Sequence, residues 1–167
     1  GDEVLCADPY FVMYKHLVNL LGGVCKPIDT YPDFKLTPGA LEAAITERSK
    51  LLVINSPANP TGVCLTRTEL AALAEVAKRH DLLVLSDEIY EVMTYDSEEH
   101  CSLLQFPEIR DRLILLNGWS KTWAMTGWRM GWSVWPNGTQ SGNLYDKVRK
   151  LAVNCWSCVK IGRASCR

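Results

Sequence analysis

The fold is decided by the apolar run Leu113-Ile-Leu-Leu-Asn117 together with the segment Ser120-Lys-Thr-Trp-Ala-Met-Thr-Gly-Trp-Arg-Met-Gly131 that follows it. A short run rich in Leu and Ile favours a buried strand. Lys121 then stands directly after this strand, and Arg129 follows inside a glycine-flanked segment. Because α/β sheets bind ligands beyond the carboxyl ends of their strands, both residues are candidates for a site.

Similar apolar runs and helical stretches alternate along the rest of the chain. Further buried strands are predicted at residues 3–7, 24–28, 51–55 and 82–86. Capping residues and glycine stops predict helices at residues 10–21, 38–44, 66–80 and 142–154. Strands that alternate with helices are typical of βαβ units. We therefore predict an α/β fold with a mainly parallel sheet and helices on both faces.

Composition limits the possible functions. The 167 residues carry a net charge of −1, which offers no global field for nucleic acid or an anionic membrane. No apolar run is long enough to cross a bilayer, and no G-x-G-x-x-G follows the first strand, which argues against a dinucleotide oxidoreductase. The seven cysteines are scattered, and Cys155-x-x-Cys158 lacks a second pair that could complete a zinc site. Reduced thiols, a cytoplasmic location and no metal site are expected.

The ends of the chain suggest a piece of something longer. The sequence starts at Gly1 without an initiator methionine, at the edge of a strand. Residues 161–167, Ile-Gly-Arg-Ala-Ser-Cys-Arg, look like translated sequencing adapter, so we exclude them from the fold. We expect residues 1–160 to form one incomplete domain and residues 161–167 to be a non-native tail.

Five polar residues follow predicted strands and are candidates for chemistry: Asn59, Asp87, Tyr90, Lys121 and Arg129. Each also has a structural explanation. The asparagine can stabilise its own turn, the aspartate can cap a helix, and the tyrosine can be a core aromatic. The lysine can lie on the surface, and the arginine can pair with a carboxylate. Their shared position at strand exits favours a site.

These residue types suit one kind of ligand. A desolvated lysine amine can form an imine with an aldehyde, and a guanidinium binds phosphate through a planar fork. A buried aspartate needs a cationic or donor partner, such as the protonated ring nitrogen of a pyridine. A phosphorylated pyridine aldehyde, pyridoxal phosphate, would satisfy all three groups.

Three motifs resemble those of a known family. They are Asn55-Ser-Pro-Ala-Asn-Pro-Thr-Gly62, Ser86-Asp-Glu-Ile-Tyr90 and Ser120-Lys-Thr-Trp-Ala-Met-Thr-Gly-Trp-Arg-Met-Gly131. In combination they are similar to the class I/II aminotransferases of the aspartate aminotransferase kind, which are fold type I enzymes dependent on pyridoxal phosphate. The resemblance extends over residues 1–159 and implies most of that family's large, cofactor-binding domain.

The resemblance implies a role for each candidate. Lys121 would hold pyridoxal phosphate as a Schiff base and then move the substrate proton. Asp87 would pair with the ring nitrogen, Tyr90 and Asn59 would bond the 3′ oxygen, and Arg129 would bind the phosphate. Phe11 would stack on the ring, with a place in the core as the alternative.

It also implies an activity, the transfer of an amino group between an amino acid and a 2-oxo acid. The full-length protein would be a homodimer. This chain alone would be inactive, because the family's phosphate-binding loop falls before Gly1 and its carboxylate-binding arginine falls after Arg167. Two alternatives keep the cofactor: a lyase or decarboxylase on the same fold, and a pyridoxal-phosphate-sensing domain of a transcription regulator.

Overall fold

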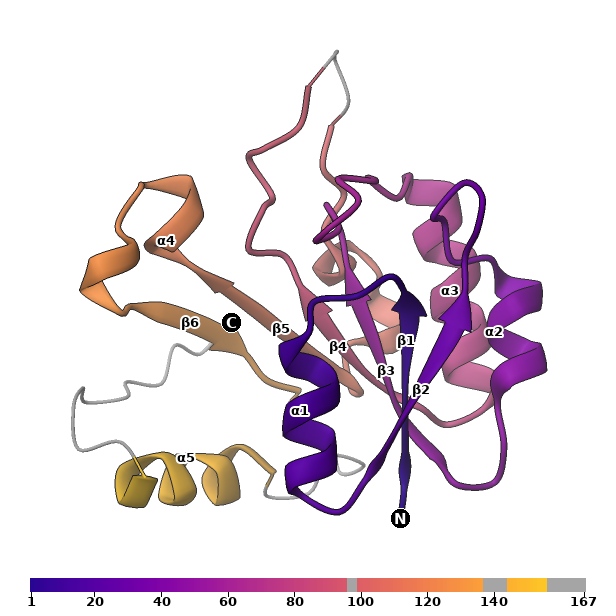
Figure 1. Cartoon of the computed structure of the whole chain (residues 1–167), viewed down its shortest axis with the longest axis horizontal. Coiled ribbons are helices and arrows are strands. Elements are labelled where there is room, and N and C mark those ends of the chain that lie inside the picture. Colours follow the sequence, from indigo (N-terminus) through magenta and orange to yellow (C-terminus); the bar gives the residue numbers. More distant parts are fainter. Residues whose placement is uncertain (96–98, 137–143, 156–167) are drawn as a thin grey trace.

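A computed structural model describes residues 1–95, 99–136 and 144–155 (Figure 1). Its centre is a six-stranded sheet in the order β2-β1-β3-β4-β5-β6. The strands are β1 (Glu3–Asp8), β2 (Val24–Asp29), β3 (Ser49–Asn55), β4 (Leu83–Asp87), β5 (Leu113–Gly118) and β6 (Gly131–Val134). The first five run parallel to one another, and β6 pairs with β5 in the antiparallel direction.

Helices lie on both faces of this sheet. They are α1 (Met13–Leu20), α2 (Pro38–Ala44), α3 (Arg67–Arg79), α4 (Trp119–Thr122) and α5 (Leu144–Cys155). Three 3₁₀ turns complete the described elements: η1 (Leu103–Gln105), η2 (Pro107–Ile109) and η3 (Thr126–Trp128). The first helix, α1, lies on one face of the sheet, whereas α2 and α3 lie on the other (Figure 1). The predicted mainly parallel α/β fold is confirmed.

The local signals in the sequence explain these elements. Thr66 and Glu69 form a reciprocal capping box at the start of α3, and Thr37 caps α2. Gly22 has a φ of 76°, a left-handed conformation that ends the turn after α1 at little steric cost. These caps fix where the helices start and stop between the strands.

The main core lies between the sheet and the α2–α3 face. Leu70, Leu73 and Ala74 follow helical spacing and are almost fully buried against Leu5 and Leu52 of the sheet. Burying one such side chain stabilises the fold by roughly 1.5–3 kcal/mol. This packing holds β1, β3 and β4 rigidly, so the ends of these strands offer fixed positions for polar side chains.

The structure differs from the predictions at three points. Helix α1 begins at Met13 rather than at residue 10, and residues 9–11 line a small cavity. The short helix α4 and the antiparallel strand β6 were not predicted. The two glycines of the Gly118–Gly131 pair let β5 and β6 approach closely, since a Cβ on Gly118 would lie 3.1 Å from the Met130 carbonyl oxygen.

Some predictions fall outside the described residues. These are the first two residues of the predicted last helix, Cys158 and the proposed tail at 161–167. Within the described part, Cys6, Cys25 and Cys101 carry free thiols. None of the described helices combines the length and the apolar character needed to cross a membrane.

Candidate functional site

The carboxyl ends of β3, β4 and β5 open into a cavity of about 380 Å³. All six residues proposed from the sequence line it: Phe11, Asn59, Asp87, Tyr90, Lys121 and Arg129. The other lining residues are Tyr14, Asn55, Ile89, Leu116, Asn117, Ser120 and Thr126. One cavity therefore brings together side chains from segments more than a hundred residues apart in the sequence. The role of each of the six residues stays a prediction.

Lys121 enters this cavity from α4, directly behind β5. Its Nζ atom lies 5.5 Å from the centre of the Tyr90 ring. The Tyr90 hydroxyl accepts a hydrogen bond from the Asn59 side-chain amide at 3.4 Å. An amine, a phenol and an amide thus lie next to one another on the cavity wall.

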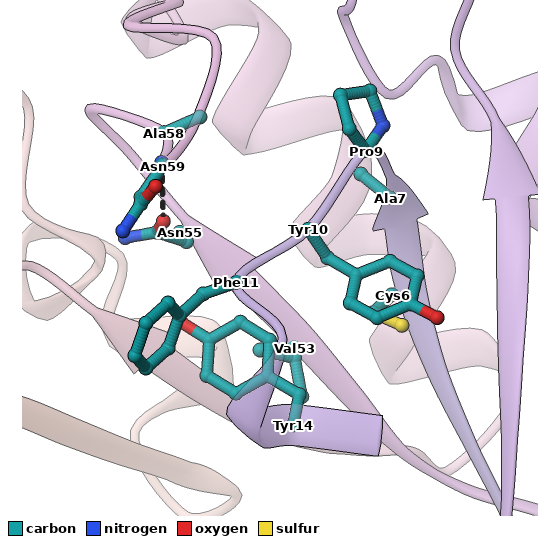
Figure 2. A pocket seen from close by; sticks show the side chains of 10 residues that line it. All are labelled: Cys6, Ala7, Pro9, Tyr10, Phe11, Tyr14, Val53, Asn55, Ala58 and Asn59. Atoms are coloured by element: carbon teal, nitrogen blue, oxygen red, sulfur yellow. Dashed lines mark hydrogen bonds between the residues drawn. The ribbon is translucent and has the colours of Figure 1, made fainter. Parts of the chain in front are cut away.

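Asn55 ties the neighbouring strand ends together. Its Oδ1 accepts the backbone N–H of Asn59 at 2.7 Å, and its Nδ2 donates to the backbone carbonyl of Asp87 at 2.9 Å. Figure 2 shows Asn55 beneath Asn59. This bridge fixes the position of the Asn59 loop relative to Asp87, which the two prolines of the loop alone cannot do.

Asp87 ends β4 inside the cavity. Its Oδ2 accepts the Tyr14 hydroxyl at 2.7 Å, and its Oδ1 accepts the backbone N–H of Ile89 at 3.3 Å. Burial raises the pKa of Asp87 above its ordinary value, even though both hydrogen bonds act to lower it. No cation among the described residues contributes to this balance. The carboxylate therefore lacks a positive partner.

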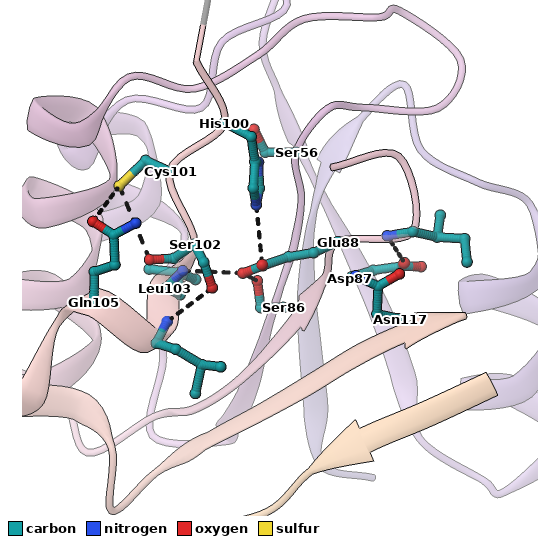
Figure 3. Close-up of polar contacts among 12 residues, drawn as sticks. Ser56, Ser86, Asp87, Glu88, His100, Cys101, Ser102, Leu103, Gln105 and Asn117 are labelled. Carbon is teal, nitrogen blue, oxygen red and sulfur yellow. Dashed lines mark hydrogen bonds and ion pairs between the residues drawn. The ribbon is translucent and has the colours of Figure 1, made fainter. Parts of the chain in front are cut away.

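The next residue, Glu88, faces the protein interior (Figure 3). Its side chain contacts the Ser86 hydroxyl at 2.8 Å, the Leu103 backbone N–H at 3.0 Å and His100 Nε2 at 3.0 Å. Burial by itself would raise the pKa of Glu88, but these hydrogen bonds, led by that of His100, hold the pKa below its ordinary value. Glu88 is a satisfied structural carboxylate.

Arg129 lines the cavity from an exposed position. Its backbone has a φ of 52°, and its Nη1 donates to the Thr126 carbonyl at 2.9 Å. Ser120 and Thr126 add hydroxyl groups to the same part of the wall, and the Thr126 hydroxyl donates to the Ser120 carbonyl at 3.2 Å. A guanidinium with neighbouring hydroxyls suits an anionic group such as a phosphate.

Phe11 and Tyr14 form an aromatic pair at the start of α1. Their ring centres lie 5.8 Å apart in an edge-to-face arrangement, and Phe11 is 37% exposed. A cavity of about 30 Å³ lies beside them, with Tyr10 and Cys6 on its wall (Figure 2). The exposure of Phe11 disagrees with the alternative that it belongs to the core and leaves its ring available to a planar ligand.

Sequence reasoning missed Tyr14, Asn55 and Asn117. Tyr14 stands three residues after Phe11, a spacing that would place both on one face of the helix predicted at residues 10–21 and could have flagged it. Asn117 is 7% exposed, and its Oδ1 accepts the backbone N–H of Gly118. Its Nδ2 is buried without a hydrogen-bond partner in the described structure. Asn117 lines the cavity wall, but its unpaired Nδ2 atom is itself buried.

Taken together, the cavity offers complementary groups for one small molecule. It presents a lysine amine, a carboxylate without a cation, a guanidinium and several neutral donors. A ligand with an electrophilic carbon, a cationic ring atom and an anionic end would use all of them.

Known proteins are similar to this chain in sequence. The model of the family described as aminotransferase class I and II matches residues 1–164. A putative aminotransferase, YugH, from Bacillus subtilis is 43% identical over 157 residues, which are 93% of this chain and 40% of that protein. An aspartate aminotransferase from Geobacillus stearothermophilus is 45% identical over 139 residues, 81% of this chain and 35% of that protein.

Solved structures agree with these matches. The aromatic aminotransferase of Pyrococcus horikoshii superposes with a TM-score of 0.87 at 38% identity, over 95% of this chain and 41% of that one. The aspartate aminotransferase of Thermus thermophilus with maleate gives a TM-score of 0.77 at 42% identity, over 81% of this chain and 35% of that one. The chain spans about 35–40% of the length of the curated relatives cited here.

Proposed function

This chain belongs to the aminotransferase class I and II family, and we propose that it forms the cofactor-binding part of an enzyme that transfers an amino group from an amino acid to a 2-oxo acid. One observation carries the proposal: the Lys121 amine and the cation-free Asp87 carboxylate line the same cavity. Relatives named as aspartate and aromatic aminotransferases support the same reaction.

The residues present fit pyridoxal phosphate. When bound, this cofactor supplies an aldehyde that attaches to amines and a pyridine ring that accepts electrons. Asp87 would bind the ring nitrogen, for which its buried carboxylate has room and no competing cation among the described residues.

The remaining roles follow from the positions of the side chains. Tyr90 and Asn59, which already contact each other, would donate to the 3′ oxygen. Arg129 would bind the phosphate from its side of the cavity, and the exposed ring of Phe11 would lie along the pyridine. Together these contacts would hold the cofactor in one orientation relative to Lys121.

Lys121 would act twice. Its amine would hold the cofactor through the aldehyde carbon, and once free it would take the proton from the substrate Cα and return one later. Asp87 would keep the ring nitrogen protonated during this transfer, which favours the loss of that proton. Losing Lys121 would remove both the attachment and the base.

The proposal extends to the whole protein. The family resemblance supports a homodimer, and the free thiols of Cys6, Cys25 and Cys101 are consistent with a cytoplasmic location. A lyase, a decarboxylase or a sensing domain could use the same cofactor pocket. The relatives named above are aminotransferases, which favours transamination over these alternatives.

The test uses the product of the complete gene, loaded with pyridoxal phosphate and treated with borohydride. We expect mass spectrometry to find the reduced cofactor on Lys121, and an amino acid with 2-oxoglutarate to yield glutamate. Lys121→Ala should lose both signals, while Lys78→Ala, an exposed lysine of α3, keeps them. Covalent labelling or turnover that survives in Lys121→Ala would overturn the assignment. Release of ammonia or CO₂ without formation of glutamate would show that the protein is a lyase or a decarboxylase rather than an aminotransferase.

A further inference from the structure

The hydrogen bond between Tyr14 and Asp87 has no part in the roles given above. It joins residues 73 positions apart in the sequence, one in α1 and the other at the end of β4. The same tyrosine ring packs edge-to-face on Phe11. Tyr14 therefore connects the aromatic segment and the carboxylate, two parts of the cavity wall that come from different elements.

Tyr14 is a donor that does not lose its proton. Burial, followed by the charge of Asp87 and the hydrogen bond itself, raises the pKa of the Tyr14 hydroxyl above its ordinary value. The phenol consequently stays neutral at working pH and can only donate towards an ionised Asp87. Together with the Ile89 N–H, it supplies one donor to each carboxylate oxygen of Asp87.

Each carboxylate oxygen has more than one acceptor position, so Asp87 can still bind a further donor. The titratable or charged groups that face it are Tyr14 from α1, Glu88 from its own chain segment and, around the cavity, Tyr90, Lys121 and Arg129. Of the side chains among the described residues, Tyr14 is the one that hydrogen-bonds to the carboxylate. Removing its hydroxyl would leave the backbone N–H of Ile89 as the remaining donor.

We propose that Tyr14 is a positioning residue that acts through Asp87: its hydroxyl fixes the carboxylate in the orientation and charge state that a protonated ring nitrogen requires. This inference rests on the proposed function, because it assigns Asp87 to the ring nitrogen of pyridoxal phosphate. Since the Tyr14 hydrogen bond favours the ionised carboxylate, its loss would shift the ionisation of Asp87 to higher pH.

The first experiment measures the dissociation constant of pyridoxal phosphate between pH 5 and 9 on the product of the complete gene. We expect Tyr14→Phe to move the acidic limb of the affinity profile upward by about one pH unit, because a hydrogen bond to a charged group is worth about that much. Tyr10→Phe is the matched control, since Tyr10 belongs to the same segment but does not line the larger cavity. An unshifted limb in Tyr14→Phe would overturn the proposal.

A double-mutant cycle separates action through Asp87 from other effects. In an Asp87→Asn background, adding Tyr14→Phe should change the cofactor affinity by less than about twofold. A carbocyclic cofactor analogue has CH in place of the ring nitrogen. The affinity for this analogue should likewise differ by less than about twofold between the Tyr14→Phe protein and the unmodified protein. Equal effects of Tyr14→Phe in both backgrounds and on both cofactors would show that Tyr14 acts by packing alone.

Different results would contradict the proposed function and the inference on Tyr14. If Asp87→Asn leaves the preference for pyridoxal phosphate over the carbocyclic analogue unchanged, the assignment of Asp87 and the proposed function fail together. If Asp87→Asn abolishes the preference and Tyr14→Phe does not reduce it, only the inference on Tyr14 fails.

Should Tyr14→Phe not fold, difluorotyrosine at position 14 keeps the ring and is a stronger hydrogen-bond donor. It should therefore move the acidic limb of the affinity profile to lower pH. An unmoved limb there would contradict the proposal equally.

Discussion

Asp87 and Glu88 are adjacent carboxylates at the end of β4, and they have opposite surroundings (Figure 3). Glu88 has hydrogen-bond partners from Ser86, His100 and Leu103, and its pKa is lowered. Asp87 faces the cavity, and burial raises its pKa. The comparison shows how one strand end can fix the structure with one acidic side chain and leave the next available to a positively charged ligand.

The largest effect is expected from neutralising the carboxylate that faces the cavity. Asp87→Asn keeps the shape of the side chain but cannot hold the ring nitrogen protonated, so we expect turnover to fall by about 10³-fold or more, which is roughly 4 kcal/mol. Borohydride should still attach the cofactor to Lys121, because attachment does not need Asp87. Single-turnover kinetics alongside mass spectrometry would measure both; unchanged turnover would remove Asp87 from the chemistry.

Neutralising the interior carboxylate should act on stability instead. Glu88→Gln replaces one of the two acceptor oxygens by a donor NH₂ group, so at least one buried partner of Glu88 loses its acceptor and the charge that strengthens the other bonds is gone. We therefore expect a loss of about 2–3 kcal/mol in the free energy of unfolding. Turnover per folded active site should stay within a few-fold of the unmodified protein. Urea denaturation would measure the loss, with the exposed Glu75→Gln of α3 as the control. A Glu88→Gln protein of full stability would contradict the structural role.

The two carboxylates should also respond to pH with opposite signs. The lowered folded-state pKa of Glu88 stabilises the protein above its ordinary value of 4.5, and this contribution is lost as the pH falls through the folded-state pKa. The raised pKa of Asp87 instead lowers stability once the pH rises above 3.8 towards the folded-state value. Hence Glu88→Gln should be most destabilising near neutral pH. In the cofactor-free protein, Asp87→Asn should be stabilising there, and both differences should shrink in acid.

A smaller effect is expected from removing one partner of Glu88. The Ser86 hydroxyl is buried and donates to Oε1 of Glu88 at 2.8 Å. Ser86→Ala should therefore cost about 1 kcal/mol of unfolding free energy and raise the pKa of Glu88 slightly. Denaturation at several pH values would detect both changes. No loss of stability would mean that the remaining donors satisfy the carboxylate by themselves.

The sequence was sufficient for much of the fold because its signals are local. The Leu-rich strands, the Thr66–Glu69 capping box and the turn at Gly22 each depend on residues close in the chain. Strand β6 has four residues and is largely exposed, including its Trp132. Its sequence therefore lacks the alternation of buried and exposed residues that predicts a strand. Its pairing with β5 depends on the contact between Gly118 and Gly131, which no local window contains.

The same distinction applies to the site. Lys121, Asp87 and Asn59 could be selected because each follows a strand, and the sheet brings strand ends together. The partner of Asp87 could not, since Tyr14 comes from α1 through a contact between distant segments. The contrast between Asp87 and Glu88 could not be predicted either. Glu88 is hydrogen-bonded by His100 and Leu103, which lie well beyond β4 in the sequence.

Whether Asp87 serves a positively charged ligand is tested by the unfolding free energies of the unmodified protein and Asp87→Asn, each measured with and without pyridoxal phosphate on the product of the complete gene. Without the cofactor, Asp87→Asn should be the more stable by about 1 kcal/mol, because it removes a buried charge that lacks a cation. With saturating cofactor the order should reverse, since the carboxylate then has its positive partner. If Asp87→Asn stays the more stable protein in both conditions, Asp87 does not serve the ring nitrogen and the account is wrong.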